Sequence, residues 1–383
     1  MSVTVVGSLN EDVLVAVDRL PGRGETVVAR SSSLAPGGKG ANQAAAAGLL
    51  GPGVHMVGRV GEDPAGDRQL AALAGSRVNV RRVLRTAGTP TGSATIPVEE
   101  GSGENLIVVV PGANAALTAQ DVDVPSVRDA RVVLLQLEVP MAAVTAAART
   151  ARGTVVLTPA PPQPLPTELL ARVDVLVPNE HELVHLAGAA PADRSPEELA
   201  ALARSVSNGD VVVTLGARGA LVVPGNGGPV LLQAPPPVPV VDTTGAGDCF
   251  SGALGQALAR GTDLPEAVRH AVAAAALSTT GPGARGALPD EEAVELLLPR
   301  VPPATPVDRP AVRPPEDRAQ ASRDEARGGA DMTESHRTPH SAERAEGDPA
   351  GEEAGGSGRT PHPEEPAEGA RDTADGDADT PDV

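Results

Sequence analysis

Aromatic residues are almost missing from this 383-residue chain, which has no tryptophan, no tyrosine and a single phenylalanine, Phe250. Aromatic side chains normally supply much of the buried area of a core, so this core must be built from aliphatic residues. The chain also has only one cysteine, Cys249, which excludes an internal disulfide and is typical of a reducing compartment. We therefore expect a cytoplasmic protein with a core of Val, Leu and Ala.

Membrane and nucleic-acid functions are disfavoured by further absences. No apolar run is long enough to span a bilayer, and residues 1–7 lack the basic and long apolar regions of a secretory signal peptide. The formal net charge is −19, which disfavours nucleic acid or an anionic membrane surface as a partner.

Lysine is scarce as well, because all but one of the 31 basic residues are arginine. The exception, Lys39, lies in the segment 36–43, Pro-Gly-Gly-Lys-Gly-Ala-Asn-Gln. The segment is not a P-loop, since Ser33 and Gly40 stand where that motif needs Gly and Ser or Thr. A lysine kept in such a sequence indicates a need for a compact ammonium charge, with chance survival in a Gly-rich loop as the alternative.

The segment 242–248, Asp-Thr-Thr-Gly-Ala-Gly-Asp, leads into a predicted helix over 247–260. Gly245 and Gly247 let the backbone approach a ligand closely, and the free N–H groups of a first helical turn favour an anion. Asp248 stands inside this anion hole. We predict that it is a catalytic base, which takes a proton from a hydroxyl that attacks a phosphoryl group. The alternative is an ordinary acidic residue at a helix start.

Apolar β-branched runs alternate with Ala- and Leu-rich helical runs, which predicts an α/β domain over residues 1–300. Its central sheet should be mostly parallel with helices on both faces, and ligands should bind at the carboxyl ends of the strands. Two segments of alternating pattern, about 12–36 and 92–112, predict a small antiparallel flap. The predicted strands are 3–7, 54–58, 132–137, 154–158, 173–177, 211–215 and 220–223, and the predicted helices are 41–50, 141–151, 196–206, 247–260 and 265–279.

Residues 301–383 differ in composition from the rest. They contain no Leu, Ile or Phe and carry 20 acidic residues against nine arginines. Such a segment cannot bury enough apolar surface to offset the entropy of ordering, so we predict a disordered acidic tail. A role in solubility, a role in partner binding and a tolerated extension all remain open.

The two Gly-rich motifs, 37–43 and 245–248, together resemble those of the ribokinase-like (PfkB) carbohydrate kinases, and the resemblance covers about residues 3–298. Other matching segments follow in the family's order: 7–12, 103–105, 111–114, 136–138, 159–161, 178–182 and 214–219. The resemblance implies a flap that closes over a sugar and forms a homodimer, ATP as the phosphoryl donor, and Mg²⁺ and K⁺ as ions. It implies D-ribose as the acceptor. Another furanose or keto-sugar, a nucleoside, or a non-catalytic regulator on the same fold are the alternatives.

The resemblance also assigns site residues. The sugar-binding residues are Asn10, Asp12, Gly38, Lys39, Asn42, Ala94, Glu138 and Asp248. The nucleotide-binding residues are Asn179, Glu182, Thr214, Gly216, Gly245, Ala246 and Gly247. A monovalent cation is assigned to Asp242, Thr244 and Gly283, and Mg²⁺ to Glu182, directly or through water.

A second pattern, His-Glu-x-x-His, is typical of zinc sites in metalloproteases. Residues 181–185 read His-Glu-Leu-Val-His, which on a helix can place two histidines on one face for zinc. No signature of a third ligand follows, and Glu182 already belongs to the kinase motif. We therefore expect no zinc catalysis and interpret His185 as a partly exposed helix residue.

Overall fold

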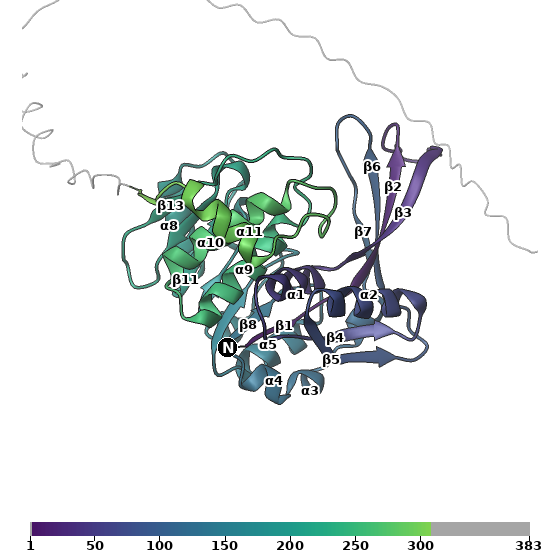
Figure 1. Ribbon diagram of the computed structural model, residues 1–383, viewed down its shortest axis with the longest axis horizontal. Coiled ribbons are helices and arrows are strands. Elements are labelled where there is room, and N and C mark those ends of the chain that lie inside the picture. The colour runs from purple at the N-terminus through teal and green to yellow at the C-terminus, as the bar shows by residue number, and fades with distance from the viewer. Residues whose placement is uncertain (1, 308–383) are drawn as a thin grey trace, which may run out of the picture. The chain divides into compact units, whose positions relative to one another are not determined.

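A ten-stranded sheet forms the centre of the computed structural model, which describes residues 2–307 (Figure 1). Its strand order is β14-β13-β12-β11-β10-β9-β8-β1-β4-β5. Neighbours from β11 to β5 are parallel, and β12, β13 and β14 add antiparallel pairs at one edge. The strands are β1 (Val3–Val6), β4 (Val54–Gly61), β5 (Val78–Thr86), β8 (Val132–Leu135), β9 (Thr154–Leu157), β10 (Val175–Leu176), β11 (Asp210–Thr214), β12 (Ala220–Val223), β13 (Leu231–Gln233) and β14 (Thr305–Pro306). The mostly parallel sheet predicted from the sequence is confirmed.

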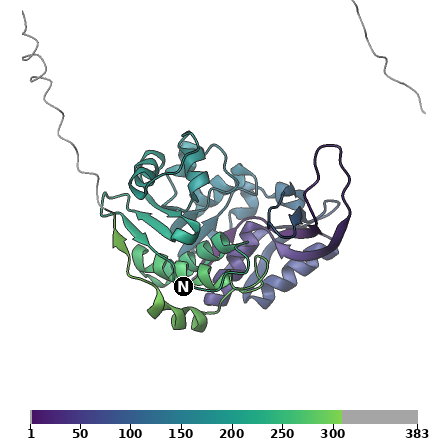
Figure 2. The same ribbon diagram turned by 90° about the horizontal axis from the view of Figure 1, so that it is seen from above.

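Helices cover both faces of this sheet, as Figure 2 shows from above. Successive strand residues such as Leu134 and Leu135 enter opposite cores, which is the period of two expected for a strand buried on both sides. One core takes residues from α1 (Lys39–Leu50), α2 (Pro64–Gly75), α9 (Ala246–Arg260), α10 (Leu264–Ser278) and α11 (Glu291–Leu297). The other takes residues from α3 (Ala119–Val122), α4 (Pro125–Arg128), α5 (Met141–Thr150), α6 (Thr167–Leu170), α7 (Glu180–Leu186) and α8 (Pro196–Val206). Between residues 2 and 307, no helix has the length and apolar character to cross a membrane.

Small residues bring α1 and α9 unusually close together. The buried face of α1 includes the run Ala44–Ala47. On α9, a Cβ at Gly252 would lie 2.5 Å from the carbonyl oxygen of Gln43, so only glycine fits there. This close packing places the first turn of α1 beside the first turn of α9, where the candidate site is built.

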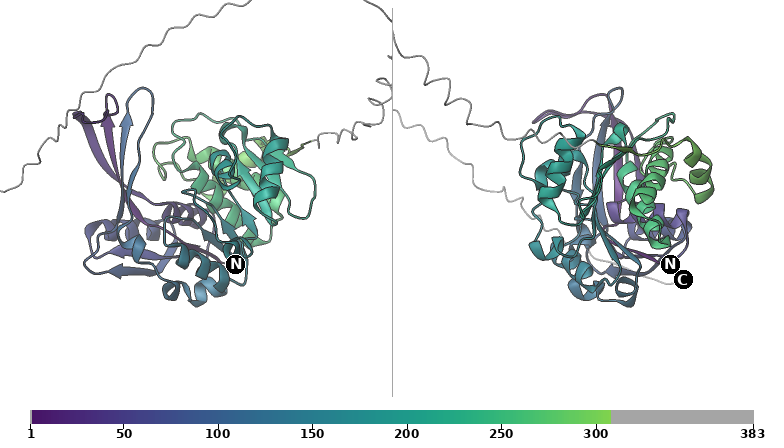
Figure 3. Two further views of the ribbon diagram at one scale, coloured as in Figure 1. Left: turned by 180° about the vertical axis from the view of Figure 1, so that it is seen from behind. Right: turned by 90° about the vertical axis from the view of Figure 1, so that its left-hand side faces the viewer.

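The flap predicted from alternating residues is a second sheet of four strands, which stands away from the α/β body (Figure 3). Its order is β3 (Ala29–Gly37), β2 (Asn10–Val17), β6 (Gly92–Glu99) and β7 (Val108–Val110). The outer pairs are antiparallel, as predicted, but the central pair β2–β6 is parallel. The chain passes through α1, β4, α2 and β5 between β3 and β6, which allows β6 to return in the direction of β2. We call this sheet the lid.

The folded part extends past the predicted boundary at residue 300. Val301 is buried in the core, and β14 pairs with β13 through Thr305 and Pro306. The Val307 N–H also donates to the Val230 carbonyl at 2.9 Å. Residues 305–307 pair with the edge of β13 and with Val230 through backbone hydrogen bonds, which require no large apolar side chains. Composition alone therefore could not locate this boundary. The rest of the predicted disordered tail, residues 308–383, lies outside the described residues.

Candidate active site

Most of the predicted site residues gather at the carboxyl ends of the central strands. Asn10 follows β1, Glu138 follows β8, and Asp248 lies in the first turn of α9. Because parallel strands expose their carboxyl ends at one edge, three distant parts of the chain meet there.

Asp248 is buried, with 9% of its surface exposed, and both of its carboxylate oxygens are held. The Asn42 Nδ2–H group donates to Oδ2 at 3.0 Å, and the Gln43 Nε2–H group donates to Oδ1 at 3.2 Å. The helix begins after Gly245, whose φ of 75° lies in the left-handed region and whose Cβ would come within 2.7 Å of Ala284. A carboxylate is therefore fixed at a helix N-terminus.

The amide oxygens of Asn42 and Gln43 each accept a hydrogen bond from another side chain. The Arg285 Nε–H group donates to Asn42 Oδ1 at 2.8 Å, and the Gln136 Nε2–H group donates to Gln43 Oε1 at 2.6 Å. Asp248 thus stands at the centre of a hydrogen-bonded network that includes these four side chains.

The first turn of α1 is capped by Ser8 and Glu138. The Lys39 N–H donates to Glu138 Oε2 at 3.0 Å, and the Gly40 N–H donates to Ser8 Oγ at 3.2 Å. The Ser8 hydroxyl in turn donates to Glu138 Oε2. A carboxylate at this position is favoured by the helix dipole, so Glu138 has a structural function in addition to any ligand contact.

The only lysine lies among acidic groups. Burial would lower the pKa of Lys39, but the charges of Asp248, Glu138 and Glu182 outweigh it, so the pKa is raised. The side chain therefore remains an ammonium group at neutral pH, and it can attract an anion or donate to a hydroxyl.

Asp12 and Ala94 face each other in the lid, where they are paired in the β2–β6 register. Burial and the Glu138 charge raise the pKa of Asp12 while the Arg285 charge lowers it, and the net result is a pKa of about 6. Asn10 is oriented from behind, because the Asn114 Nδ2–H group donates to its Oδ1 at 2.7 Å. The polar side chains predicted to hold a sugar are thus partly buried and in fixed orientations.

Gly38 joins the lid to α1 in a conformation that other residues rarely adopt. Its φ is 88°, and a Cβ there would lie 2.7 Å from the Asn10 backbone nitrogen. Glycine is required here by the contact with Asn10. This contact fixes the position of the first turn of α1, which carries Lys39 and Asn42.

Four of the residues predicted for the nucleotide, Asn179, Glu182, Thr214 and Gly216, lie at or after the ends of β10 and β11. Asn179 and Thr214 form an isolated parallel bridge. Asn179 caps α7, and its N–H and Nδ2–H groups each donate to a Glu182 oxygen at 2.9 Å. Burial raises the pKa of Glu182. A Cβ at Gly216 or Gly247 would meet nothing within 4 Å, so open space lies beside both glycines.

The predicted monovalent-cation residues are also brought together. Asp242 Oδ1 accepts from the Thr244 N–H and Oδ2 accepts from the Gly283 N–H, both at 2.8 Å. Burial would raise the pKa of Asp242, but hydrogen bonding with the Thr244 side chain and with the Thr244 and Gly283 N–H groups outweighs it and lowers the pKa. The carboxylate ties the segment before α9 to the loop after α10.

The His-Glu-x-x-His pattern does not assemble a metal centre in the part of the chain that the structure covers. His181 and His185 are exposed, while Glu182 is buried and turned toward Asn179. Among residues 2–307 there is no group of three or more His, Cys, Asp or Glu side chains that could hold a metal ion.

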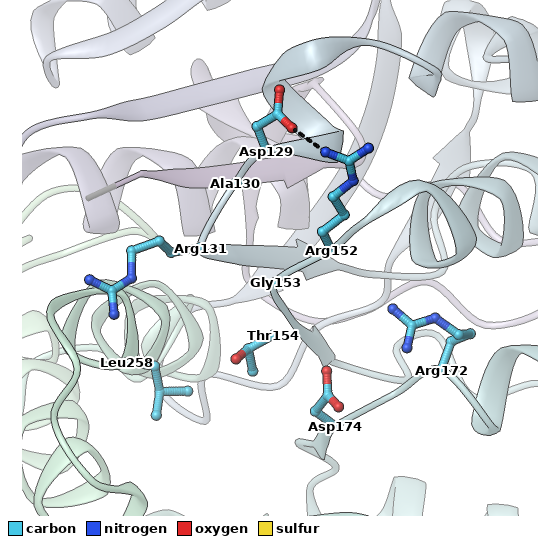
Figure 4. Close-up of a pocket in the computed structure, with 9 residues that line it drawn as sticks. All are labelled: Asp129, Ala130, Arg131, Arg152, Gly153, Thr154, Arg172, Asp174 and Leu258. Atoms are coloured by element: carbon cyan, nitrogen blue, oxygen red, sulfur yellow. Dashed lines mark hydrogen bonds and ion pairs between the residues drawn. The ribbon is translucent and has the colours of Figure 1, made fainter.

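A cavity of about 660 Å³ opens at the opposite end of the sheet, at the amino ends of β8 and β9 (Figure 4). It contains none of the predicted site residues. Arg152 is paired there with Asp129, and Arg172 donates to the carbonyl oxygens of Ala148 and Ala151. These arginines are explained by their structural contacts.

Five residues in the site were not assigned from the sequence. Ser8, Gln43, Asn114 and Gln136 lie inside the motif segments 7–12, 37–43, 111–114 and 136–138, so a closer study of those segments could have found them. Arg285 lies in the Gly- and Pro-rich loop 279–287, where no local pattern indicates which way a side chain points.

Comparison with known proteins identifies the family of the chain. A family profile described as pfkB family carbohydrate kinase matches residues 1–291. The chain is 37% identical over 302 residues to a ribokinase of Bacillus subtilis, covering 78% of this chain and 99% of the relative. It is 38% identical over 305 residues to a ribokinase of Arabidopsis thaliana, covering 77% and 80%.

Solved structures give the same result. A ribokinase of Thermotoga maritima matches with a TM-score of 0.71 and 34% identity, covering 78% of this chain and 99% of that one. Arabidopsis thaliana ribokinase complexed with ribose and ATP matches with a TM-score of 0.70 and 36% identity, covering 78% and 98%. The fold, the site and these relatives define a phosphotransferase that uses an alcohol group as the acceptor. The chain belongs to the pfkB family of carbohydrate kinases.

Proposed function

We propose that this kinase transfers the γ-phosphoryl group of ATP to the terminal CH₂OH group of D-ribose, which gives D-ribose 5-phosphate and ADP. The observation that carries this proposal is the placement of Asp248, a buried carboxylate fixed by two amides in the first turn of α9, beside the open space at Gly247. Relatives named ribokinase, one of them solved with ribose and ATP, support the choice of substrates.

The sugar side of the proposed site is polar. We assign the sugar to the side chains of Asn10, Asp12, Lys39, Asn42 and Glu138, with Gly38 and Ala94 allowing close approach. An ionised carboxylate such as Asp12 accepts from several hydroxyls, and amides donate and accept. The only aromatic residue, Phe250, is buried with 3% of its surface exposed. No ring is therefore available to stack on a nucleobase, which favours a sugar over a nucleoside.

In the proposed reaction, Asp248 removes the hydroxyl proton as the sugar oxygen attacks phosphorus. The backbone N–H groups of Gly245, Ala246 and Gly247, at the start of α9, stabilise the charge on the transferring group. Lys39 adds a positive charge on the same side of the site. We assign the nucleotide phosphates and ribose to Asn179, Glu182, Thr214 and Gly216, which lie along the strand ends next to this helix.

Two ions fit the residues present. Glu182 is a single carboxylate with both oxygens already hydrogen-bonded to Asn179, which suits Mg²⁺ that keeps its waters and binds phosphate oxygens. Asp242 has further lone pairs on oxygens that already accept from Thr244 and Gly283, which suits a monovalent cation completed by backbone carbonyls. Mg²⁺ bound with ATP would neutralise phosphate charge during transfer.

We further propose that the protein forms a homodimer through the lid. The lid carries exposed apolar residues, which include Leu34 and the run Leu106–Val110. An exposed apolar strand edge requires cover, and a second copy of the same lid offers a matching surface.

The decisive experiment is a coupled assay of ADP release with a panel of acceptors. D-ribose should give a kcat/KM at least about tenfold above those of 2-deoxyribose, fructose and adenosine, because unpaired polar groups penalise an acceptor that lacks the matching hydroxyl. A higher kcat/KM for fructose or adenosine would overturn the assignment of ribose as the acceptor but would leave the assignment of kinase activity in place. Binding of ribose and ATP without ADP release would instead favour the non-catalytic regulator.

The ion assignments are tested in the same assay. Replacing K⁺ by a bulky organic cation at constant ionic strength should lower the rate, and a zinc chelator should leave activity in place. An unchanged rate without K⁺ would remove the monovalent site. Loss of activity with the chelator would support a zinc site at the His-Glu-x-x-His pattern.

A further inference from the structure

Arg285 reaches the candidate active site from the loop between α10 and α11. Its Nε–H group donates to Asn42 Oδ1 at 2.8 Å, and its Nη2–H group donates to the Gly37 carbonyl oxygen at 3.1 Å. Asn42 is 243 positions away in the sequence. The same edge of the guanidinium thus holds the end of β3 and the first turn of α1.

The contact with Asn42 decides which way that amide points. An asparagine side chain has an acceptor and a donor end of nearly equal size, so only its partners distinguish the two orientations. A guanidinium offers donors alone, and an ionised carboxylate offers acceptors alone. With Arg285 on one side and Asp248 on the other, Asn42 must turn Oδ1 to the arginine and Nδ2 to the carboxylate. The observed orientation satisfies both groups.

We propose that Arg285 is a positioning residue for phosphoryl transfer, which fixes the Asn42 amide in the orientation that holds the catalytic carboxylate. The proposal rests on Asp248 being the base of the proposed reaction. Without Arg285, the Asn42 amide can rotate and present its oxygen to Asp248, which would repel the carboxylate and release it from one of its two anchors.

The second amide gives an internal comparison. Gln43 holds Asp248 Oδ1 and is itself oriented by Gln136. Gln136 is neutral, so it fixes an amide without adding charge. Arg285 fixes an amide and also adds a positive charge. Burial lowers its pKa to about 10, which still leaves it charged at neutral pH, and its charge is balanced by Asp12 and Asp248.

The charge of Arg285 acts on Asp12 as well. Burial raises the pKa of Asp12, the charges of Glu138 and Asp248 also raise it, and the charge of Arg285 lowers it. Loss of the arginine therefore raises the pKa of Asp12 further. A purely structural arginine far from the site has no such effect.

The test is a double-mutant cycle with D-ribose and MgATP. Arg285→Leu should lower kcat by about tenfold in the wild-type background but by no more than about twofold in the Asp248→Asn background, because no base is left to position. Equal losses in both backgrounds would overturn the proposal. If Asp248→Asn alone turns over normally, the assignment of the base fails instead, and the two failures are distinguishable.

A second readout is the pH profile of kcat/KM for ribose. In Arg285→Leu the acid limb should move to higher pH, and a limb that stays in place contradicts the proposal. Arg285→Lys keeps a charge and a donor but not the planar fork, so it should recover part of the lost kcat and of the limb shift. This variant also keeps the test available if Arg285→Leu does not fold.

Arg172 provides the matched control. It is half-buried like Arg285 and donates to two backbone carbonyl oxygens, at 3.2 Å and 3.0 Å, but it lines the cavity shown in Figure 4, which contains none of the predicted site residues. Arg172→Leu should lower the melting temperature while leaving kcat and the pH profile unchanged. A fall in kcat as large as that of Arg285→Leu would show that loss of any buried arginine accounts for the effect.

Discussion

At the residue scale, the proposed role of Asp248 can be tested directly by a substitution. Asp248→Asn keeps the size of the side chain and removes the base, so kcat should fall by about 10² or more while ATP binding changes little. Steady-state kinetics and nucleotide titration measure both. Asp263→Asn is a suitable control, because Asp263 caps α10 and asparagine is an equally good cap. Near-normal turnover of Asp248→Asn would remove it as the base.

Asp12 should give the enzyme a pH dependence on the sugar side. Its pKa is about 6, and sugar hydroxyls donate best to an ionised carboxylate, so kcat/KM for ribose should fall as the pH drops below about 6. Asp12→Asn should weaken ribose binding and also remove this acid limb. The same limb in the Asp12→Asn profile would assign the titration to another group.

The same shift has a consequence for stability, with a definite sign. The folded state raises the pKa of Asp12 from 3.8 to about 6, so it binds this proton more tightly than the unfolded state does. The contribution of Asp12 to stability is therefore fully present below 3.8 and is lost as the pH rises through about 6. Urea unfolding without ligand should show Asp12→Asn gaining stability relative to the wild type over this interval.

The sequence could predict which residues gather at the site because each stands beside a strand end or a helix start that its own segment defines. Lys39, Asn42 and Asp248 illustrate this, since their segments carry local signals. Arg285 has no such signal: its partner Asn42 lies 243 positions away, and only the folded chain joins them.

At the element scale, the start of α1 depends on Gly38. Gly38→Ala forces a Cβ against the Asn10 nitrogen at 2.7 Å in addition to an unfavourable φ, and it should destabilise the fold by more than about 2 kcal/mol. Gly88→Ala is the control, because its φ of 70° is also positive but a Cβ there meets nothing within 4 Å. Urea unfolding should show a clearly smaller loss for Gly88→Ala. Equal losses would mean that the contact with Asn10 is unimportant.

Elements with strong local patterns could be predicted, and those set by chain path could not. Helix α8 has the predicted bounds, since Pro196 and the Ser195 capping box mark its start. Strand β5 was missed, because its outward residues include several arginines and only two of its nine residues are buried. The parallel direction of β2 and β6 depends on the segments between them, which no local pattern encodes.

At the scale of the whole molecule, the boundary near residue 307 can be tested by truncation. A chain ending after Val307 should keep its melting temperature and kcat/KM, since the removed residues contain no Leu, Ile or Phe. A chain ending after Arg300 loses the buried Val301 and strand β14, so its melting temperature should fall by several degrees. A similar fall for the longer chain would show that the tail stabilises the domain.

The proposed dimer predicts a change of mass in solution. Ile107→Lys combined with Val109→Lys places charge on β7 and on the exposed residue just before it, and should convert a dimer to a monomer in light scattering. Leu296→Lys is the control, because Leu296 is also exposed but lies on α11, away from the lid. A monomeric wild-type protein, or a dimer that survives the double substitution, would exclude the lid as the interface.

The single lysine also makes this protein chemically addressable. Apart from the amino terminus, Lys39 carries the only primary amine in the chain, and it lies at the candidate active site among carboxylates that raise its pKa. An amine-directed acylating reagent should therefore modify one internal position, slowly at neutral pH and faster in alkali. A sugar or nucleotide that covers the ammonium should slow this modification further. Mass spectrometry of the one peptide that contains Lys39 would then report the occupied fraction of the site without an engineered label.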